Sequence, residues 1–260
     1  MLSGGDRMTE EMEATERLLD EGPQLVREAE RQGLSVRLLG GVAIRVLLGE
    51  RFDPAFARPL HDIDLFTRKR DSRKLEGLIK DHGWAPSREF NALNGNRRLL
   101  FNDPDSEAQI DVFVEAFEMA HSLPLTDGLR ETGLTMPGTE LLMTKLQIVK
   151  LNEKDRDDCY ALFAGCAIGD DGPVSIDPKR IARLTGHDWG LNHTFELNLG
   201  RLTADLGSRS LPAERITAIG DGIAAVSNAI EAEPKSRGWR LRARIGERKQ
   251  WYGEPEEVRR

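Results

Sequence analysis

Apolar and polar residues alternate along several short stretches in the first half of the chain. The clearest case is Leu-His-Asp-Ile-Asp-Leu-Phe over residues 60–66, which has the period of a half-buried β-strand. Further strands are predicted at 36–39, 97–101 and 109–117, helices at 42–48 and 72–82, and a loop at the glycine- and proline-containing segment 49–59.

The beginning of the chain is polar and acidic, with apolar residues at helical spacing. It predicts a helix over 9–20 and a second helix over 24–32, because Pro23 lacks the backbone donor that a continuous helix would use. No basic stretch followed by an apolar one is present here, so we expect no secretory signal.

From residue 139 onward the pattern becomes almost entirely helical. Helices are predicted at 139–151, 155–164, 178–184, 193–206 and 212–231. The sequence therefore predicts an α+β fold, in which a mixed sheet with flanking helices (residues 1–138) is followed by an α-helical domain (residues 139–260).

Composition restricts the class of protein. The 260 residues are 39% hydrophobic and 31% charged, so a core can form beneath a solvated surface. Two cysteines cannot build a disulfide framework, and no apolar run approaches the length of about 18 residues that a membrane helix needs. We therefore expect a cytoplasmic protein that makes no membrane contact, and the net charge of −7 argues against general coating of polyanions.

Gly40 and Gly41 lie where the first predicted strand runs into a helix. Backbone N–H groups at a helix N-terminus attract anions, and the absence of side chains lets phosphate oxygens approach closely. The alternative is an ordinary strand-to-helix turn, which the two glycines favour when they are considered alone.

Three aspartates on predicted strands are candidate metal ligands. Alternation places Asp62 and Asp64 on one face of their strand, and two neighbouring carboxylates stay ionised together most easily with a cation such as Mg²⁺ between them. Asp111 lies within an apolar strand, where a carboxylate is costly to bury unless it is paired or bound to metal. The alternatives are a solvated strand face for the first two residues and a strand-edge position for Asp111.

The combination of these features resembles the nucleotidyltransferase superfamily, which has the polymerase-beta-like fold. The stretches Leu-Gly-Gly-Val-Ala-Ile-Arg (39–45) and Arg-Pro-Leu-His-Asp-Ile-Asp-Leu (58–65) carry the likeness, and aminoglycoside and lincosamide nucleotidyltransferases show similar ones. Segments 140–147 and 154–158 resemble the lysine helix and the acidic segment of AbiEii-type toxins. The resemblance spans residues 34–163 and implies a nucleotidyltransferase-like sheet.

The resemblance implies an Mg²⁺-dependent enzyme that transfers a nucleoside monophosphate from an NTP to an acceptor hydroxyl. The three aspartates Asp62, Asp64 and Asp111 would hold two Mg²⁺ ions, and Asp111 could also act as general base. The phosphates would be bound by Gly40, Gly41, Arg45 and Lys145. Asp155 or Asp158 would orient Lys145 or bind the nucleotide base.

Several of these assignments have alternatives. Lys145 could extend past neighbouring leucines to solvent, and Arg45 could be a surface charge. The segment Arg156-Asp157-Asp158 matches the final toxin motif only loosely, so the functional acid could be Asp155, Asp157 or Asp158. A catalytically silent binding module with this fold is the alternative to an enzyme.

The C-terminal segment indicates candidate acceptors and partners. It is rich in cations and has aromatic residues among or beside them: Lys235, Arg237, Arg240, Arg242, Arg244, Arg248 and Lys249, with Trp239, Trp251 and Tyr252. Such a pattern suits RNA, so one expected acceptor is tRNA bound through Arg237, Arg240, Arg242 and Arg244. If the segment is only a solvated helix, a small hydroxylated molecule is the better acceptor. A toxin would in addition have a separate antitoxin partner.

Overall fold

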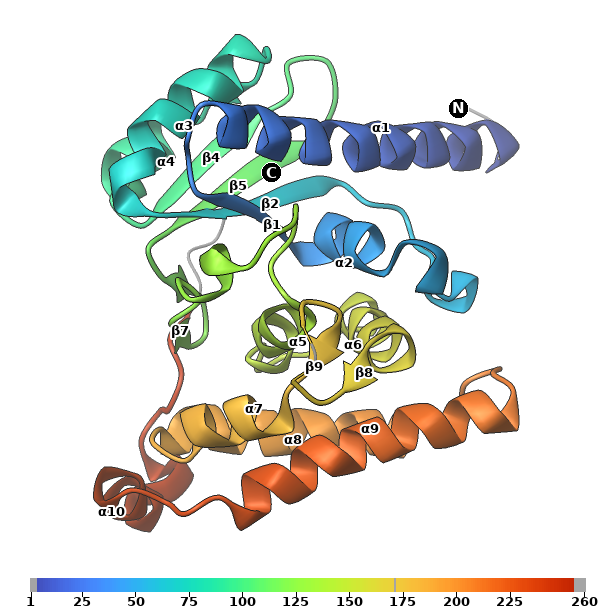
Figure 1. The fold of residues 1–260 in the computed structure, drawn as a ribbon, viewed down its shortest axis with the longest axis vertical. Helices are drawn as coiled ribbons and strands as arrows, with labels where there is room; N and C mark the ends of the chain where they lie inside the picture. The colour runs from blue at the N-terminus through green and yellow to red at the C-terminus, as the bar shows by residue number, and fades with distance from the viewer. Residues whose placement is uncertain (1–3, 171, 255–260) are drawn as a thin grey trace.

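The computed structural model describes residues 4–170 and 172–254 (Figure 1). Within these residues, five strands form one mixed sheet in the order β1-β2-β5-β4-β3. The strands β2 and β5 run parallel, and the other neighbours are antiparallel, which confirms the prediction of a mixed sheet in an α+β fold. Their bounds are β1 (Val36–Leu39), β2 (Asp62–Thr67), β3 (Ala85–Pro86), β4 (Arg98–Asn102) and β5 (Gln109–Val114).

The first helix corrects a sequence prediction. α1 (Gly4–Arg31) is continuous, whereas the sequence predicted two helices separated at Pro23. Leu18 before the proline and Leu25 after it are both fully buried in the same core. Burial of this one apolar stripe, worth about 2 kcal/mol per leucine, offsets the single backbone hydrogen bond that the proline removes.

The two faces of the sheet differ in polarity. Ile63 pairs with Ile110 on one face, where both are fully buried, and Gly22 of α1 lies against Ile63. Side chains of adjacent strand residues point to opposite faces, so Asp64 and its register partner Asp111 lie on the other face. The candidate chemistry thus lies on the face opposite Ile63 and Ile110, where Phe66 and Phe113 are buried beside it.

Three further helices accompany the sheet. α2 (Gly40–Leu48) follows β1 without a loop and packs against β2, and α3 (Lys69–Asp81) follows β2 and contacts α1. The segment after α2, predicted as a loop, contains two short 3₁₀ turns. The sequence did not predict α4 (Arg88–Asn94), which packs on β4 with no fully buried residue of its own.

Helices also dominate the rest of the described chain. In Figure 1, α7, α8 and α9 form a layer at the bottom, and α5 and α6 lie between this layer and α2. A continuous cluster of buried apolar residues runs through both halves, so the core is not interrupted where the domain boundary was predicted. The bounds are α5 (Gly138–Leu146), α6 (Glu153–Gly165), α7 (Pro178–Thr185), α8 (Trp189–Leu206), α9 (Ala213–Ala232) and α10 (Arg237–Ile245).

Helix ends differ from the predicted ones for local reasons. The helix predicted to reach residue 151 ends at Leu146, because Asn198 of α8 donates hydrogen bonds of 2.8 Å to the carbonyls of Leu146 and Ile148. α8 begins four residues before the predicted start, because Asp188 caps it by accepting from the N–H of Leu191. No helix in the described part of the chain combines the length and the apolar character needed to cross a membrane.

Short strand pairs lie outside the main sheet. The strand predicted over 109–117 is divided, because Glu115 has a φ of +68°, a conformation that does not continue a strand. Its second part, β6 (Phe117–Glu118), pairs with β7 (Ser122–Leu123). In the helical half, β8 (Ala167–Ile168) pairs with β9 (Ser175–Ile176), which the sequence did not predict.

Candidate active site

The two glycines form the junction between β1 and α2. Gly40 has a φ of +67°, and a Cβ atom at this position would overlap the carboxylate of Asp64. A Cβ on Gly41 would come within 2.8 Å of Leu60 and 2.9 Å of the Nη2 atom of Arg58. The start of α2 can therefore pack directly against Asp64 and Arg58 only because Gly40 and Gly41 have no side chains.

The carboxylates of Asp62, Asp64 and Asp111 interact electrostatically across β2 and β5. Burial, followed by the charges of Asp111 and Asp62, raises the pKa of Asp64 to about 7, while Lys145 and Arg98 act in the opposite direction. Burial and the two neighbouring carboxylates thus both disfavour the charged form of Asp64.

Arg98 of β4 is a site residue that the sequence did not indicate. Its guanidinium donates to both oxygens of Asp111, with Nε–Oδ distances of 2.8 Å and 3.0 Å and a further bond from Nη2. It also lies between the rings of Phe90 and Phe113, 5.5 Å and 5.2 Å from their centroids. Burial raises the pKa of Asp111, and Arg98 opposes that rise.

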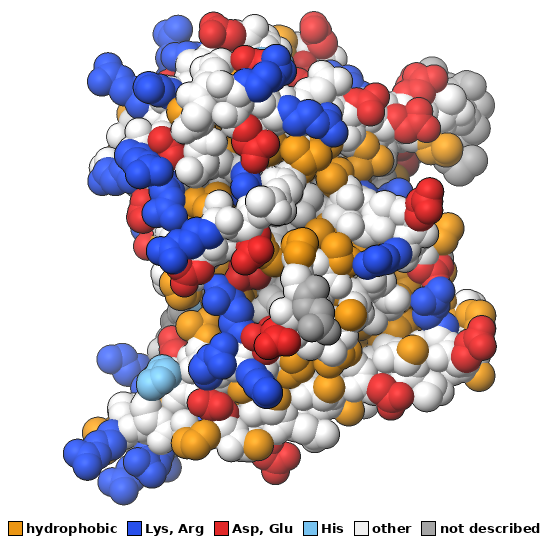
Figure 2. Space-filling model, viewed as in Figure 1, with side chains coloured by type: hydrophobic (Ala, Val, Ile, Leu, Met, Phe, Trp, Pro, Cys, Tyr) orange, Lys and Arg blue, Asp and Glu red, His pale blue; other side chains and the backbone are white. Residues whose placement is uncertain are grey.

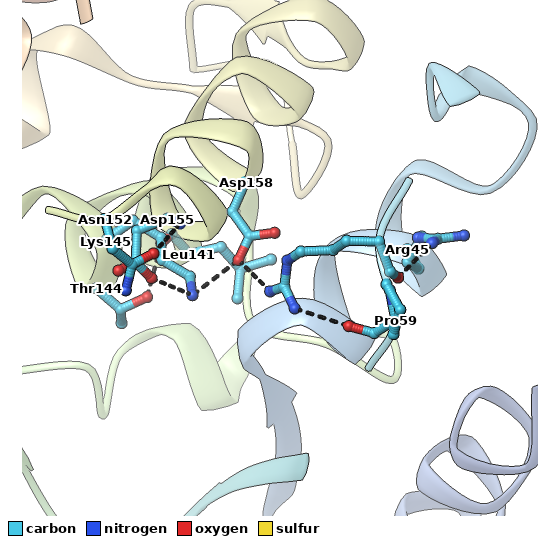
Figure 3. Close-up of polar contacts among 9 residues, drawn as sticks. Arg45, Pro59, Leu141, Thr144, Lys145, Asn152, Asp155 and Asp158 are labelled. Atoms are coloured by element: carbon cyan, nitrogen blue, oxygen red, sulfur yellow. Dashed lines mark hydrogen bonds and ion pairs between the residues drawn. The ribbon is translucent and has the colours of Figure 1, made fainter. Parts of the chain in front are cut away.

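Lys145 lies at the centre of a buried ion-pair network (Figure 3). Its Nζ atom is 2.8 Å from Asp158 and 3.3 Å from Asp155. Burial alone would lower the pKa of Lys145, but Asp158 and Asp155 outweigh burial and raise the pKa above its ordinary value. Asp158 also accepts a 2.8 Å hydrogen bond from Arg58, and these two cations hold the pKa of Asp158 low despite its burial.

The sequence left open whether Asp155, Asp157 or Asp158 is the functional acid, and the contacts of these three residues differ. Asp155 and Asp158 both contact Lys145. Asp157 points elsewhere and forms a 2.7 Å ion pair with Arg209. The side chain of Lys145 is 13% exposed, so it does not extend past the leucines into solvent.

One pocket of about 170 Å³ collects most of the predicted residues. It receives side chains or backbone from α2 and β2 in the first half of the chain and from α5 and α6 in the second. Asp111 and Gly40 lie behind this lining, next to Asp64. The lining residues are Gly41, Arg58, Leu60, His61, Asp62, Asp64, Lys145, Asn152, Lys154 and Asp155.

Arg45 does not line this pocket. Its guanidinium stacks 4.4 Å from the centroid of Phe52 and donates to the carbonyl of Arg58 at 3.1 Å. Burial, together with the nearby charge of Arg58, lowers the pKa of Arg45. The contacts of Arg45 thus support the segment that carries Arg58.

The basic C-terminal segment forms α10, a blue cluster at the lower left of Figure 2. Arg242 lies 4.6 Å from the Trp189 ring centroid and donates to the carbonyls of Gly246 and Lys249. The indole of Trp251 donates to Thr194 and packs against Trp189. These contacts engage Arg242 and Trp251 within the protein, whereas Arg237, Arg240 and Arg244 are exposed.

No protein-family model matches the chain, and no curated protein matches it at a significant level. The pocket combines carboxylates, a buried lysine and a helix N-terminus that no side chain caps among the described residues.

The acidic face carries candidate ligands for a metal ion. Asp62 and Asp64 supply hard oxygen donors, and a divalent cation would offset the burial and the carboxylate repulsion that raise the pKa of Asp64. Asp111, the third predicted ligand, is already engaged by Arg98. Among the described residues, no group of three or more His, Cys, Asp or Glu is arranged to hold a metal ion. The pair formed by Asp62 and Asp64 therefore fits Mg²⁺ by its chemistry, and ligation by Asp111 stays a prediction.

Gly40→Ala will destabilise the protein more than Gly49→Ala. Both glycines have positive φ, but a Cβ on Gly49 meets nothing within 4 Å, whereas one on Gly40 overlaps Asp64. Backbone strain alone costs about 1 kcal/mol, or roughly 3 °C in melting temperature. We expect the contact with Asp64 to bring the loss at Gly40 to about 3 kcal/mol or more, roughly 10 °C, measured by differential scanning calorimetry. Equal losses would show that Asp64 does not depend on Gly40.

Proposed function

We propose that this chain is a nucleotidyltransferase that transfers a nucleoside monophosphate from an NTP to an acceptor hydroxyl. The observation that carries the proposal is the convergence of Gly41, Asp62, Asp64, Lys145 and Asp155 on one pocket. A phosphate-binding turn, a carboxylate pair and a fixed cation are the groups that phosphoryl transfer to a hydroxyl requires. The mixed sheet that carries them agrees with the resemblance to the polymerase-beta-like fold.

Each side chain has a physical role in this proposal. The N–H groups at the start of α2 bind phosphate oxygens, because no side chain in the described part of the chain caps that end of the helix. Lys145, held in place by Asp155 and Asp158, presents a fixed positive charge to the triphosphate. Asp62 and Asp64 would hold Mg²⁺, which when bound neutralises phosphate charge and polarises the reacting phosphorus.

Asp111 lies beside Asp64 on the same face of the sheet and is paired with Arg98. Because both oxygens of Asp111 accept from Arg98, its carboxylate is held in one orientation beside Asp64. A general base must hold its acceptor oxygen within hydrogen-bond distance of the reacting hydroxyl. As general base, Asp111 would use lone pairs that its bonds with Arg98 leave available.

Two acceptor classes follow from different observations. Exposed Arg237, Arg240 and Arg244 on α10 support tRNA, whose phosphates they would pair with. The inward packing of Trp251 removes a ring expected to stack on bases, which supports a small hydroxylated molecule instead. The toxin resemblance favours RNA and, with it, an antitoxin partner.

A transfer assay tests the function. Wild-type protein is incubated with Mg²⁺ and each α-labelled NTP in turn, with total tRNA and without RNA. Label in RNA from one NTP supports an RNA nucleotidyltransferase. Magnesium-dependent NTP binding without RNA labelling supports a small-molecule acceptor. If the protein neither binds nor transfers any NTP, the proposed function is wrong.

A further inference from the structure

Arg58 lies across the glycine turn at the edge of the pocket. It precedes β2 by four residues, and its Nη2 atom is 2.9 Å from the position that a Cβ on Gly41 would take. It lines the same pocket as Asp62, Asp64 and Lys145. The guanidinium thus lies beside the start of α2, in the pocket where the phosphates of a nucleotide are proposed to lie.

The hydrogen bonds of Arg58 leave donors unused. Nη2 donates to Asp158, and Nη1 makes a 3.2 Å bond to the carbonyl of the adjacent Pro59. The buried Nε–H has no hydrogen-bond partner among the described residues. A guanidinium carries five N–H donors in a planar fork, and a buried donor without a partner is unfavourable. An anion with several oxygens would satisfy such a group better than its present partners do.

Asp158 can give up Arg58 at little cost. The oxygen that accepts from Arg58 is also 2.8 Å from Nζ of Lys145. If Arg58 moved away, the carboxylate would keep this second cation, and Lys145 would keep Asp155 as well. The network therefore holds Arg58 near the pocket in a contact that can be exchanged for another.

We propose that Arg58 is a phosphate-binding residue. Without nucleotide it is paired with Asp158, and when the nucleotide binds, Arg58 leaves Asp158 and binds the β- and γ-phosphates. This inference rests on the proposed function, since the ligand is the triphosphate of the same site. The planar fork of arginine pairs with two phosphate oxygens at once, which a lysine cannot do. Lys145 stays fixed by two carboxylates, whereas Arg58 moves.

The test measures binding of inorganic pyrophosphate with Mg²⁺, and of the four NTPs and NMPs, by titration calorimetry. We expect Arg58→Gln to weaken pyrophosphate and NTP binding by about 10- to 100-fold, and Arg58→Lys to weaken it by a smaller factor. NMP binding should change less than threefold, because an NMP lacks the phosphates that Arg58 contacts. A loss caused by disturbed structure would weaken NMP and pyrophosphate binding alike.

A control variant completes the test. Arg215→Gln is the matched control, since it removes an arginine paired with Asp53 outside this pocket and should leave binding unchanged. Unchanged pyrophosphate binding by Arg58→Gln, or an equal loss of NMP and pyrophosphate binding, would overturn the inference alone. A wild type that binds neither pyrophosphate nor any NTP would overturn the proposed function with it.

Discussion

Asp64→Asn will abolish nucleotidyl transfer and, in metal-free buffer at pH 8, will raise the thermal stability of the protein. Burial, followed by the charges of Asp111 and Asp62, raises the pKa of this carboxylate to about 7. Neutral asparagine removes the repulsion and the desolvation of a charge while keeping nearly the same shape. Residues placed for function often reduce stability, because the arrangement needed for chemistry is not the one that packs best.

The sign of the pH dependence follows from this raised pKa. Between about pH 4 and pH 7 the unfolded chain has lost the proton of Asp64 and the folded protein has kept it, so the free energy of unfolding falls as pH rises. Above pH 7 both states are ionised and the penalty is complete, on the order of 4 kcal/mol for a pKa raised by about three units. The advantage of Asp64→Asn should therefore be near zero at pH 4 and largest at pH 8, where we expect roughly 5 °C or more.

Melting curves at pH 4.5, 6 and 8 with EDTA measure this difference, and the transfer assay measures the loss of activity. Added Mg²⁺ should stabilise the wild type at pH 8 and should not stabilise Asp64→Asn. Asp103→Asn is a control for which we expect a loss of stability at pH 8. Hydrogen bonds from Ser106 and Arg17 outweigh burial and lower the pKa of Asp103, so its charged form stabilises the fold. Retained transfer by Asp64→Asn would remove the metal role of Asp64. A stability difference that does not change with pH would contradict the raised pKa.

The sequence predicted those parts of the site that depend on neighbouring residues. Alternation placed Asp62 and Asp64 on one strand face, and the two glycines marked the start of α2. Asp111 was found as an acid in an apolar strand, and the parallel register of β2 and β5 brings it beside Asp64. The aspartate pair, the glycine turn and Asp111 could be recognised from the local pattern of apolar and polar residues alone.

The residues that pair across long separations were not predictable in the same way. Arg58 and Asp158 are a hundred positions apart, and their contact depends on how α6 packs against the segment before β2. The partner of Asp111, Arg98, stands at the start of a strand, where a charged residue usually marks only the strand end. Trp251 was predicted to contact RNA because it follows a run of cations, yet it packs against α8. An isolated charge beside an apolar strand was the one sequence signal that could have identified Arg98.

Lys145→Met is expected to destabilise the protein strongly. The substitution leaves the buried carboxylate of Asp155 without its lysine and leaves Asp158 with Arg58 alone. Removing one partner of a buried ion pair typically costs 3–5 kcal/mol, since the remaining charge is buried and uncompensated. Urea unfolding at pH 7.5 measures this loss, and nucleotide binding should be lost in parallel, because the fixed cation of the site is gone.

The pH dependence distinguishes uncompensated charge from a simple packing defect. In the wild type the pKa of Asp158 is held low, so the pair stabilises the fold above the ordinary aspartate pKa and the stabilisation is lost as pH falls through the lowered value. The difference between wild type and Lys145→Met should therefore shrink as the pH falls through the lowered pKa of Asp158, where that carboxylate becomes protonated in the folded protein. Adding Asp155→Asn to Lys145→Met should recover part of the loss at pH 7.5, a coupling that a double-mutant cycle measures. Additive losses, or a difference independent of pH, would show that Lys145 contributes packing alone, and the fixed cation of the proposed triphosphate site would then have to be Arg58.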